Sequence, residues 1–254
     1  MNEADRLHQI LESVAERLAG VLEDAQFERG DGYCFMAFPT FPIRDINGLW
    51  ASTDAAADQV EATRTKAKKL GTPFTVMTRA GRTPAVEEAA RELGLTKEIP
   101  IPGMTVTPLE LNDPSTDLEV LGVETADGLA QALAVGASGF GVPAELVASL
   151  YALDVAELEG LEYYLGRAEG RDVSTAVGFT IDGTTGIFSV ATPEEHRGHG
   201  YGAAITARAV RDGFAAGADL AGLQSSPMGE SVYKRLGFRE VETYVLFTPP
   251  SKSH

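Results

Sequence analysis

A glycine-rich bend between a predicted strand and a predicted helix constrains this chain more than any other stretch. Residues 186–191 are mostly apolar and include β-branched and aromatic side chains, which favour a strand. Pro193 ends that strand, because proline cannot donate a hydrogen bond to a sheet ladder. The bend reads RGHGYG over residues 197–202, and the alanine-rich segment after it predicts a helix that ends near Gly217. The chain therefore runs from a strand through a glycine-rich turn into the first turn of a helix.

Such a bend can bind phosphate oxygens through its main chain. The first N–H groups of a helix have no partner within the helix, and the helix dipole adds partial positive charge there. Glycine lets the main chain approach a ligand closely and adopt a positive φ. Arg197, at the start of the bend, is expected either to shape the loop or to add charge. The sequence therefore predicts a phosphate-binding turn.

Three interpretations of the bend are open at this point. Gly198, Gly200 and Ala203 fit the dinucleotide-binding pattern G-x-G-x-x-G/A. However, several residues separate the strand from His199, whereas a dinucleotide site has its glycines directly after the strand. The pattern R-x-x-G-x-G, which begins at Arg197, is that of the diphosphate loop of an acyl-CoA acyltransferase. The third interpretation is a glycine-rich connection that binds no ligand.

Two sequence blocks resemble the Gcn5-related N-acetyltransferase (GNAT) family. The first, V-x-x-P-x-x-x-R-x-x-G-x-G, begins at Val190 and is similar to the acetyl-CoA block of that family. The second follows a short predicted strand at residues 220–224, where Tyr233, three further residues and a Gly-Phe pair are similar to the end of the family's last block. The two blocks occur in the family's order and at about its usual spacing. The resemblance covers about residues 160–248.

The resemblance implies transfer of an acetyl group from acetyl-CoA, as cosubstrate, to an acceptor that is usually an amine. It implies that the strand ending near Val190 splays from its neighbour and pairs with the pantetheine arm, while the bend holds the diphosphate. The N–H of Val190 is then a candidate oxyanion donor, worth about 10²–10³ in rate. Tyr233 is the candidate proton donor to the departing thiolate, worth typically about 10²–10⁴. The cofactor-binding residues expected are Val190, Ala191, Thr192, Arg197, Gly198, His199, Gly200, Tyr201 and Gly202.

Each of these roles has an alternative. Tyr233 can be a core aromatic on a buried helix face, and Met228 is expected to contribute packing only. No general base can be identified, because Glu194, Glu195 and His196 adjoin the bend but are expected to be solvated. One rival to the enzyme is a catalytically silent acyl-CoA-binding or regulatory protein on the same fold. Another is a small-molecule-binding protein whose first half is the working part. The presence of both the bend and the tyrosine favours an N-acetyltransferase.

The order of predicted elements occurs twice in the chain. Segments 48–51, 70–71 and 93–95 correspond to segments 186–189, 216–217 and 236–238. The first copy is shorter, has no counterpart of the glycine-rich bend, and carries Ala90 where the second carries Tyr233. We therefore expect a tandem protein with a degenerate GNAT-like N-terminal domain at 1–113, a polar linker, and an acetyltransferase domain at 118–254. The alternative is an unrelated N-terminal α/β domain.

The fold class that follows is α/β (α+β). Each of the two GNAT-like units is expected to be a mixed, mostly antiparallel twisted sheet flanked by helices. The helices between residues 126 and 161 are expected to cover the acceptor pocket. Because two fused halves can imitate a dimer within one chain, we expect a monomer.

Composition narrows the partners. The formal net charge of −16 argues against nucleic-acid binding and suits a cationic acceptor, either a small-molecule amine or a peptide amine. Cys34 is the only cysteine, which excludes an intramolecular disulfide and fits a cytoplasmic protein. No apolar run predicts a membrane span, and no cluster of Cys and His predicts a metal site.

Overall fold

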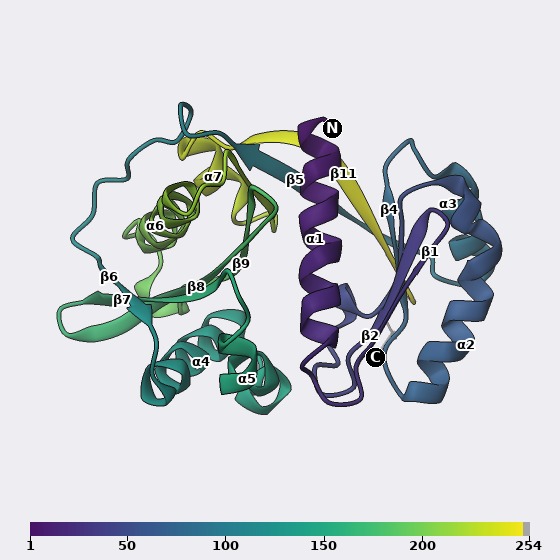
Figure 1. Cartoon of the computed structure of the whole chain (residues 1–254), viewed down its shortest axis with the longest axis horizontal. Coiled ribbons are helices and arrows are strands. Elements are labelled where there is room, and N and C mark those ends of the chain that lie inside the picture. Colours follow the sequence, from purple (N-terminus) through teal and green to yellow (C-terminus); the bar gives the residue numbers. More distant parts are fainter. Residues whose placement is uncertain (251–254) are drawn as a thin grey trace. The chain divides into compact units, whose positions relative to one another are not determined.

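A computed structural model describes residues 1–250 and has an α/β fold in which two units share the chain (Figure 1). Unit 1 comprises Met1–Val14 and Gly103–Val241, and unit 2 comprises Ala15–Pro102 and the described residues from Glu242 onward. Each unit is thus built from two separate segments, whereas the sequence predicts two consecutive domains, 1–113 and 118–254. The strand at residues 97–106 crosses the boundary between Pro102 and Gly103, and the strand at residues 239–248 crosses the boundary between Val241 and Glu242.

Unit 1 contains a mixed sheet in the order β5-β10-β9-β8-β7-β6. Only β9 and β10 run parallel, and the other paired strands run antiparallel. The strands are β5 (Lys97–Val106), β6 (Glu119–Val123), β7 (Leu161–Ala168), β8 (Arg171–Ile181), β9 (Thr184–Ala191) and β10 (Leu220–Gln224). The helices are α1 (Glu3–Ala19), which continues into unit 2, α4 (Ala126–Phe140), α5 (Leu153–Ala156), α6 (Tyr201–Ala215) and α7 (Glu230–Arg235).

Helices cover both faces of this sheet (Figure 1). On one face, α6 and α7 pack on an apolar cluster that includes Tyr164, Ile187, Ile205 and Tyr233. On the other face, α4 and the segment that follows it pack on a second cluster, which includes Tyr163. Side chains alternate between the faces of a strand, so adjacent residues of β7 contribute to opposite layers. The sheet of unit 1 therefore lies between two helical layers.

Unit 2 has the strand order β1-β2-β3-β4-β11, with β3 and β4 parallel. Its elements are β1 (Gln26–Gly30), β2 (Tyr33–Ala37), β3 (Gly48–Ala51), the 3₁₀ helix η2 (Asp54–Gln59), α2 (Val60–Leu70), β4 (Thr75–Arg79), α3 (Pro84–Glu92) and β11 (Arg239–Thr248). Helices α2 and α3 pack on an apolar cluster that includes Leu49, Val76 and Phe247. The expected α/β class, with mixed and mostly antiparallel strand pairing flanked by helices, is confirmed.

The two units repeat one order of elements. In unit 1 the parallel pair β9 and β10 is linked by α6, and α7 follows β10. In unit 2 the parallel pair β3 and β4 is linked by α2, and α3 follows β4. Next to its parallel pair, each unit has an antiparallel strand from the other predicted half of the chain: β5 beside β10, and β11 beside β4.

Several predicted elements differ in detail from the structure. The sequence pattern predicts no strand at β1 and one helix from Asp54 to Leu70, but that helix begins as the 3₁₀ helix η2. The pattern also predicts a short helix from Pro143 to Tyr151, where the structure has two 3₁₀ turns, η3 (Ala144–Leu146) and η4 (Ala148–Tyr151). The predicted hairpin turns at Glu169 and Asp182 are confirmed, and in both turns the two central residues have positive φ, as in a type I′ turn.

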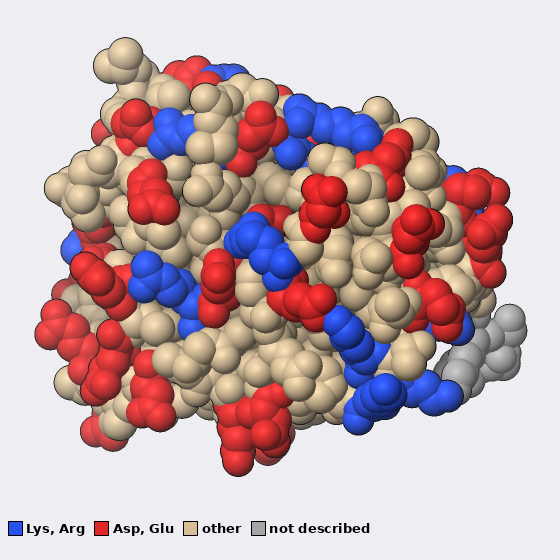
Figure 2. All heavy atoms as spheres, turned by 45° about the vertical axis from the view of Figure 1, so that its right-hand side comes forward, with Lys and Arg blue, Asp and Glu red and all other residues tan. Residues whose placement is uncertain are grey.

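Acidic side chains are spread over the surface. On the face shown in Figure 2, Asp and Glu side chains form many separate groups, with Lys and Arg side chains between them. The excess negative charge is therefore not gathered into one patch on that face. Over residues 1–250, no helix has the length and apolar character that a membrane crossing requires.

Candidate functional site

Strand β9 parts from its neighbour before it reaches the bend. Its ladder with β10 ends at the pair Gly222 and Gly186, although β10 continues to Gln224 and β9 to Ala191. The register thus leaves residues 187–191 without a partner on β10. This confirms the expected splay, and it opens a gap in the hydrogen-bonding of the sheet that an extended ligand can fill.

A β-bulge lies in the splayed part of β9. Thr175 of β8 faces Ala191 and Val177 faces Phe188, so Ser189 and Val190 share one opposite residue. Ser189 has a φ of 51°, which is an uncommon conformation for a residue other than glycine. Sequence analysis missed this bulge, because a serine within an apolar strand does not signal a left-handed conformation.

The segment after the bulge is held from both sides. The Ser174 hydroxyl donates to the Ala191 carbonyl at 3.1 Å and lies 3.2 Å from the Thr192 hydroxyl. A Cβ built on Gly139 of α4 would come within 2.8 Å of the Ala191 side chain and 3.0 Å of the Thr192 nitrogen. Helix α4 therefore needs glycine at position 139 in order to pack on the end of β9.

The bend is open to solvent and has the left-handed geometry that favours glycine. After Thr192, the chain passes through the 3₁₀ helix η5 (Glu194–His196) and reaches α6. Gly198 and Gly200 have φ values of 84° and 81°, and a Cβ on either would meet no atom within 4 Å. Other residues are strained at these two positions by the backbone conformation, while the space beside them is free for a ligand.

The main-chain donors of the bend have no acceptors among the described residues. The first hydrogen bond of α6 runs from the Ala204 nitrogen to the Gly200 oxygen at 3.0 Å. Residues 198–203 therefore present six N–H groups at the start of a helix, and Gly200, at the N-cap, supplies no side-chain cap. Such a group of donors at the positive end of a helix dipole is suited to a phosphate or diphosphate.

Arg197 shapes the entrance to the bend. Its Nε donates to the Thr192 carbonyl at 3.0 Å, and a terminal nitrogen donates to the Gly139 carbonyl at 3.0 Å. The guanidinium thus ties the start of the bend to the end of β9 and to α4. Of the two roles expected for Arg197, this geometry favours the shaping of the loop.

His199 and Tyr201 lie on the bend without closing it. The His199 ring is exposed, its Nδ1 lies 3.0 Å from the Arg197 carbonyl, and it stacks on the Tyr201 ring with 5.4 Å between ring centroids. Desolvation, together with the Asp117 and Glu169 carboxylates, raises the pKa of Tyr201. These carboxylates oppose an anionic ligand, so binding of a diphosphate depends on the local N–H groups and Arg197.

Tyr233 lies on α7 and is 9% exposed. Its ring belongs to the apolar cluster beneath α6 and packs against Phe238, with 5.8 Å between centroids. Burial raises the pKa of Tyr233 to about 12, so the hydroxyl keeps its proton at neutral pH. The side chain is therefore both a core aromatic and a potential proton donor, and its placement fits either interpretation.

The corresponding part of unit 2 is built differently. After β3, the 3₁₀ helix η2 continues directly into α2, and no glycine lies between them. The Asp54 carboxylate accepts a hydrogen bond from the Ala85 nitrogen at 2.8 Å, so an acid already caps α3. Ala90, the counterpart of Tyr233 in the repeat, is fully buried.

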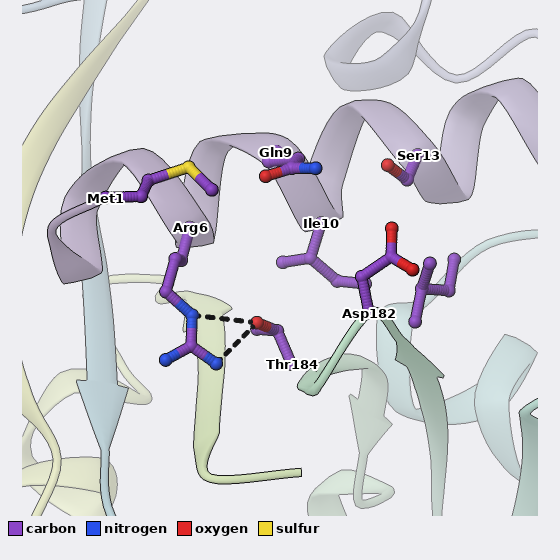
Figure 3. Close-up of a pocket in the computed structure, with 8 residues that line it drawn as sticks. Met1, Arg6, Gln9, Ile10, Ser13, Asp182 and Thr184 are labelled. Atoms are coloured by element: carbon purple, nitrogen blue, oxygen red, sulfur yellow. Dashed lines mark hydrogen bonds between the residues drawn. The ribbon is translucent and has the colours of Figure 1, made fainter.

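A separate cavity lies at the opposite end of β9 (Figure 3). It has a volume of about 110 Å³ and lies between the start of α1 and the turn that joins β8 to β9. Arg6 donates to the hydroxyl of Thr184 and to the carbonyl of Gly183, and it forms an ion pair with Asp219. These bonds use Arg6 to fasten α1 to the sheet. Over residues 1–250, no group of three or more His, Cys, Asp or Glu side chains could hold a metal ion.

Comparison with known proteins identifies the fold. No protein-family model matches the sequence, and no curated protein matches it. A GCN5-related N-acetyltransferase from Kribbella flavida is 21% identical, with a TM-score of 0.70 over 95% of this chain and 96% of that one. A GCN5-related N-acetyltransferase from Sphaerobacter thermophilus is 16% identical, with a TM-score of 0.60 over 94% of this chain and 90% of that one.

A third solved structure extends the likeness. A functionally unknown conserved protein from Staphylococcus epidermidis is 14% identical, with a TM-score of 0.65 over 91% of this chain and 97% of that one. The chain therefore has the fold of the GCN5-related N-acetyltransferases. Because these matches cover nearly all of each chain, the likeness extends over both units and is not limited to the segment that carries the two sequence blocks.

Proposed function

We propose that this protein is an N-acetyltransferase that moves an acetyl group from acetyl-CoA to an amine, with its site in unit 1. The observation that carries the proposal is the open bend, in which the six N–H groups of residues 198–203 lack protein acceptors. The bend follows a strand that has parted from its neighbour, after the short 3₁₀ helix η5. A diphosphate at the bend and an amide-bearing arm along β9 would supply the acceptors and donors that these two features lack.

The residues of unit 1 divide the work as follows. Val190, Ala191 and Thr192 offer their main chain to the pantetheine arm, and the bend binds the diphosphate. The Val190 N–H, at the bulge, stabilises the negative charge that develops on the thioester oxygen when the amine attacks. Tyr233 gives its proton to the sulfur as the carbon–sulfur bond breaks, or donates a hydrogen bond to the thiolate. The attacking amine loses its proton to solvent water or to a base, and no residue of either unit is assigned as that base.

Gly202 allows a direct test of the diphosphate site. It is the second residue of α6, and a Cβ there would meet only the Thr192 hydroxyl oxygen at 3.7 Å, which is ordinary contact. Gly202→Ala should therefore fold at least as stably as the wild type, since alanine favours a helix by about 1 kcal/mol over glycine. The same methyl group occupies space beside the N–H groups, and we expect the Kd for acetyl-CoA to rise at least tenfold.

The matched control is Gly122→Ala, which adds a methyl group to open space on the exposed strand β6. Calorimetric titration with acetyl-CoA and urea unfolding should be carried out on all three proteins. We expect the control to bind like the wild type. Equal acetyl-CoA affinity in Gly202→Ala and the wild type, or no binding by the wild type, would contradict the proposed site.

The rival function is a silent acyl-CoA-binding or regulatory protein. It is favoured by the packing of Tyr233 in the apolar cluster, where the ring has a structural role without chemistry. A thiol-release assay with acetyl-CoA and a panel of polyamines, amino sugars and peptide N-termini separates the two functions. Release above the rate of uncatalysed hydrolysis with any amine supports the enzyme, whereas binding without release across the panel supports the rival.

A further inference from the structure

The hydroxyl group of Thr206 is buried without a hydrogen-bond partner. Thr206 lies in the middle of α6, is 0% exposed, and is the one polar side chain in the buried set of that helix. A threonine at such a position ordinarily bonds to the carbonyl four residues earlier, but here its hydroxyl has no partner. Since an unsatisfied buried hydroxyl destabilises a fold and valine has nearly the same shape, this hydroxyl requires an explanation.

The position of Thr206 on α6 places it over the bulge of β9. Positions 202, 206, 209 and 213 share one face of the helix, because they follow helical spacing. A Cβ on Gly202 would lie 3.7 Å from the Thr192 hydroxyl oxygen, and a Cβ on Gly213 would come within 2.1 Å of the hydroxyl oxygen of Thr185 on β9. Thr206 lies between these two positions on the helix face that follows β9 from residue 185 to residue 192.

The peptide that joins Ser189 to Val190 lies within that stretch. The register gives it no partner on β10, and on β8 its two residues share one opposite residue. Ser189 also has a left-handed φ of 51°. The helix face that carries the unpartnered hydroxyl therefore covers a stretch of β9 in which the ladder is irregular. Because a peptide unit is planar, a bond to the Ser189 carbonyl would fix the direction of the Val190 N–H, which points the opposite way.

We infer that Thr206 is a positioning residue for the bulge: its hydroxyl donates to the Ser189 carbonyl when a thioester lies against β9. The bond aims the Val190 N–H at the thioester oxygen and is broken when no acyl group is present. This inference rests on the proposed function, and it assigns to α6 a role beyond its N-terminal bend. It predicts that Thr206 affects the binding of acetyl-CoA but not that of CoA, which has no thioester oxygen.

The test compares Thr206→Val, which removes the hydroxyl, with Thr206→Ser, which keeps it. Calorimetry with acetyl-CoA and with CoA, together with urea unfolding, is carried out on each variant and on the wild type. We expect Thr206→Val to raise the Kd for acetyl-CoA about three- to tenfold, which corresponds to one hydrogen bond, and to leave the Kd for CoA unchanged. Its unfolding midpoint should not fall, and Thr206→Ser should bind both ligands like the wild type.

Two results overturn the inference while leaving the proposed function in place. One is an unchanged affinity for both acetyl-CoA and CoA in Thr206→Val. The other is an equal loss of both affinities, which indicates general disruption of α6. Thr206→Ala, which also lacks the hydroxyl, must repeat the behaviour of Thr206→Val if the latter does not fold. If the wild type binds neither ligand, the proposed function fails first and the inference fails with it.

Discussion

Tyr233 combines a packing role with a candidate chemical role in one side chain. Its ring lies in the apolar cluster of unit 1, and burial raises the pKa of its hydroxyl to about 12. A thiol has an unperturbed pKa of about 8.5, so the thiolate is a moderate leaving group that benefits from a proton without requiring one. The phenol is consequently neutral over the whole range in which an amine acceptor would be tested.

We expect Tyr233→Phe to lower kcat by about tenfold to a hundredfold and to leave the Kd for acetyl-CoA unchanged. The phenyl ring keeps the packing against Phe238. Tyr163→Phe is the matched control, because the Tyr163 hydroxyl donates to the Leu150 carbonyl in the other layer of unit 1. That control should lose stability and keep kcat. Steady-state kinetics and urea unfolding measure both effects, and an unchanged kcat in Tyr233→Phe would remove the proton donor from the mechanism.

The buried tyrosines of unit 1 also predict how stability depends on pH. Burial raises the pKa values of Tyr151 and Tyr233 to about 12, and it raises that of Tyr163 further. Below pH 10 the folded and unfolded states both hold these protons. Between pH 10 and 12 the unfolded state releases protons that the folded state keeps. The free energy of unfolding should therefore fall by about 1.4 kcal/mol per pH unit for each tyrosine.

Urea unfolding at pH 8, 9, 10 and 11 checks this expectation. Stability from these groups should be fully present at pH 8 and 9 and should decline above pH 10. Tyr233→Phe should reduce the slope above pH 10 by one tyrosine's share, because phenylalanine does not ionise. A free energy of unfolding that stays constant from pH 9 to 11 would contradict the raised pKa values.

At the scale of elements, the junction of β9, α4 and the bend depends on one guanidinium. Arg197 bonds to the carbonyls of Thr192 and Gly139, and Gly139 in turn packs on the end of β9. The contact joins α4, which precedes β7, β8 and β9 in the chain, to the loop that follows β9. The shape of the bend thus depends on α4, which lies about sixty residues earlier in the chain.

We expect Arg197→Ala to weaken acetyl-CoA binding about three- to thirtyfold, because the loop loses two anchoring hydrogen bonds. The unfolding free energy should change by less than about 1 kcal/mol, since the side chain is exposed. Arg208→Ala is the matched control, because this arginine also donates to a main-chain carbonyl, that of Val120, from the exposed side of α6. Calorimetry measures both variants, and equal affinities in the two would show that Arg197 does not shape the site.

At the scale of the whole molecule, the two units share an order of elements but differ between the first strand of the parallel pair and the helix that follows it. Unit 2 has η2 where unit 1 has the glycine bend, and the Asp54 carboxylate lies at the start of α3. A negative charge at that position opposes a diphosphate. The tandem origin of the units remains a prediction, and it is supported by the common order of their parallel strands and helices.

Calorimetric titration should therefore give one acetyl-CoA bound per chain. The reason is that unit 1 has unpartnered N–H groups in the glycine bend before α6, whereas in unit 2 the 3₁₀ helix η2 takes the place of the bend and carries the Asp54 carboxylate, which bonds to the start of α3. Asp54→Asn, which removes the charge and keeps the cap, should leave the number of bound ligands at one. Two molecules of acetyl-CoA bound per chain would contradict a single site. So would acetyl-CoA binding that persists in Gly202→Ala and is lost only when a residue of unit 2 is also substituted.

Much of this architecture could be predicted from sequence, where local signals are strong. Strands β3 and β10 have the predicted bounds, and the bend lies between a strand and a helix as expected. Strand β1 was missed because its residues, QFERG, are mostly exposed and show no apolar alternation. The bulge at Ser189 and the orphan hydroxyl of Thr206 depend on register and packing between distant segments, which no local pattern encodes.

Strand β11 sets a limit on the order in which the protein can fold during translation. Its residues from 242 onward complete the sheet of unit 2, which otherwise begins at residue 15. A ribosome adds about 5–20 residues per second, so the edge of β4 stays open for on the order of ten seconds while residues 103–241 are made. Nascent chains that stall in this interval expose an unpaired strand edge, which makes them candidates for capture by chaperones and for aggregation.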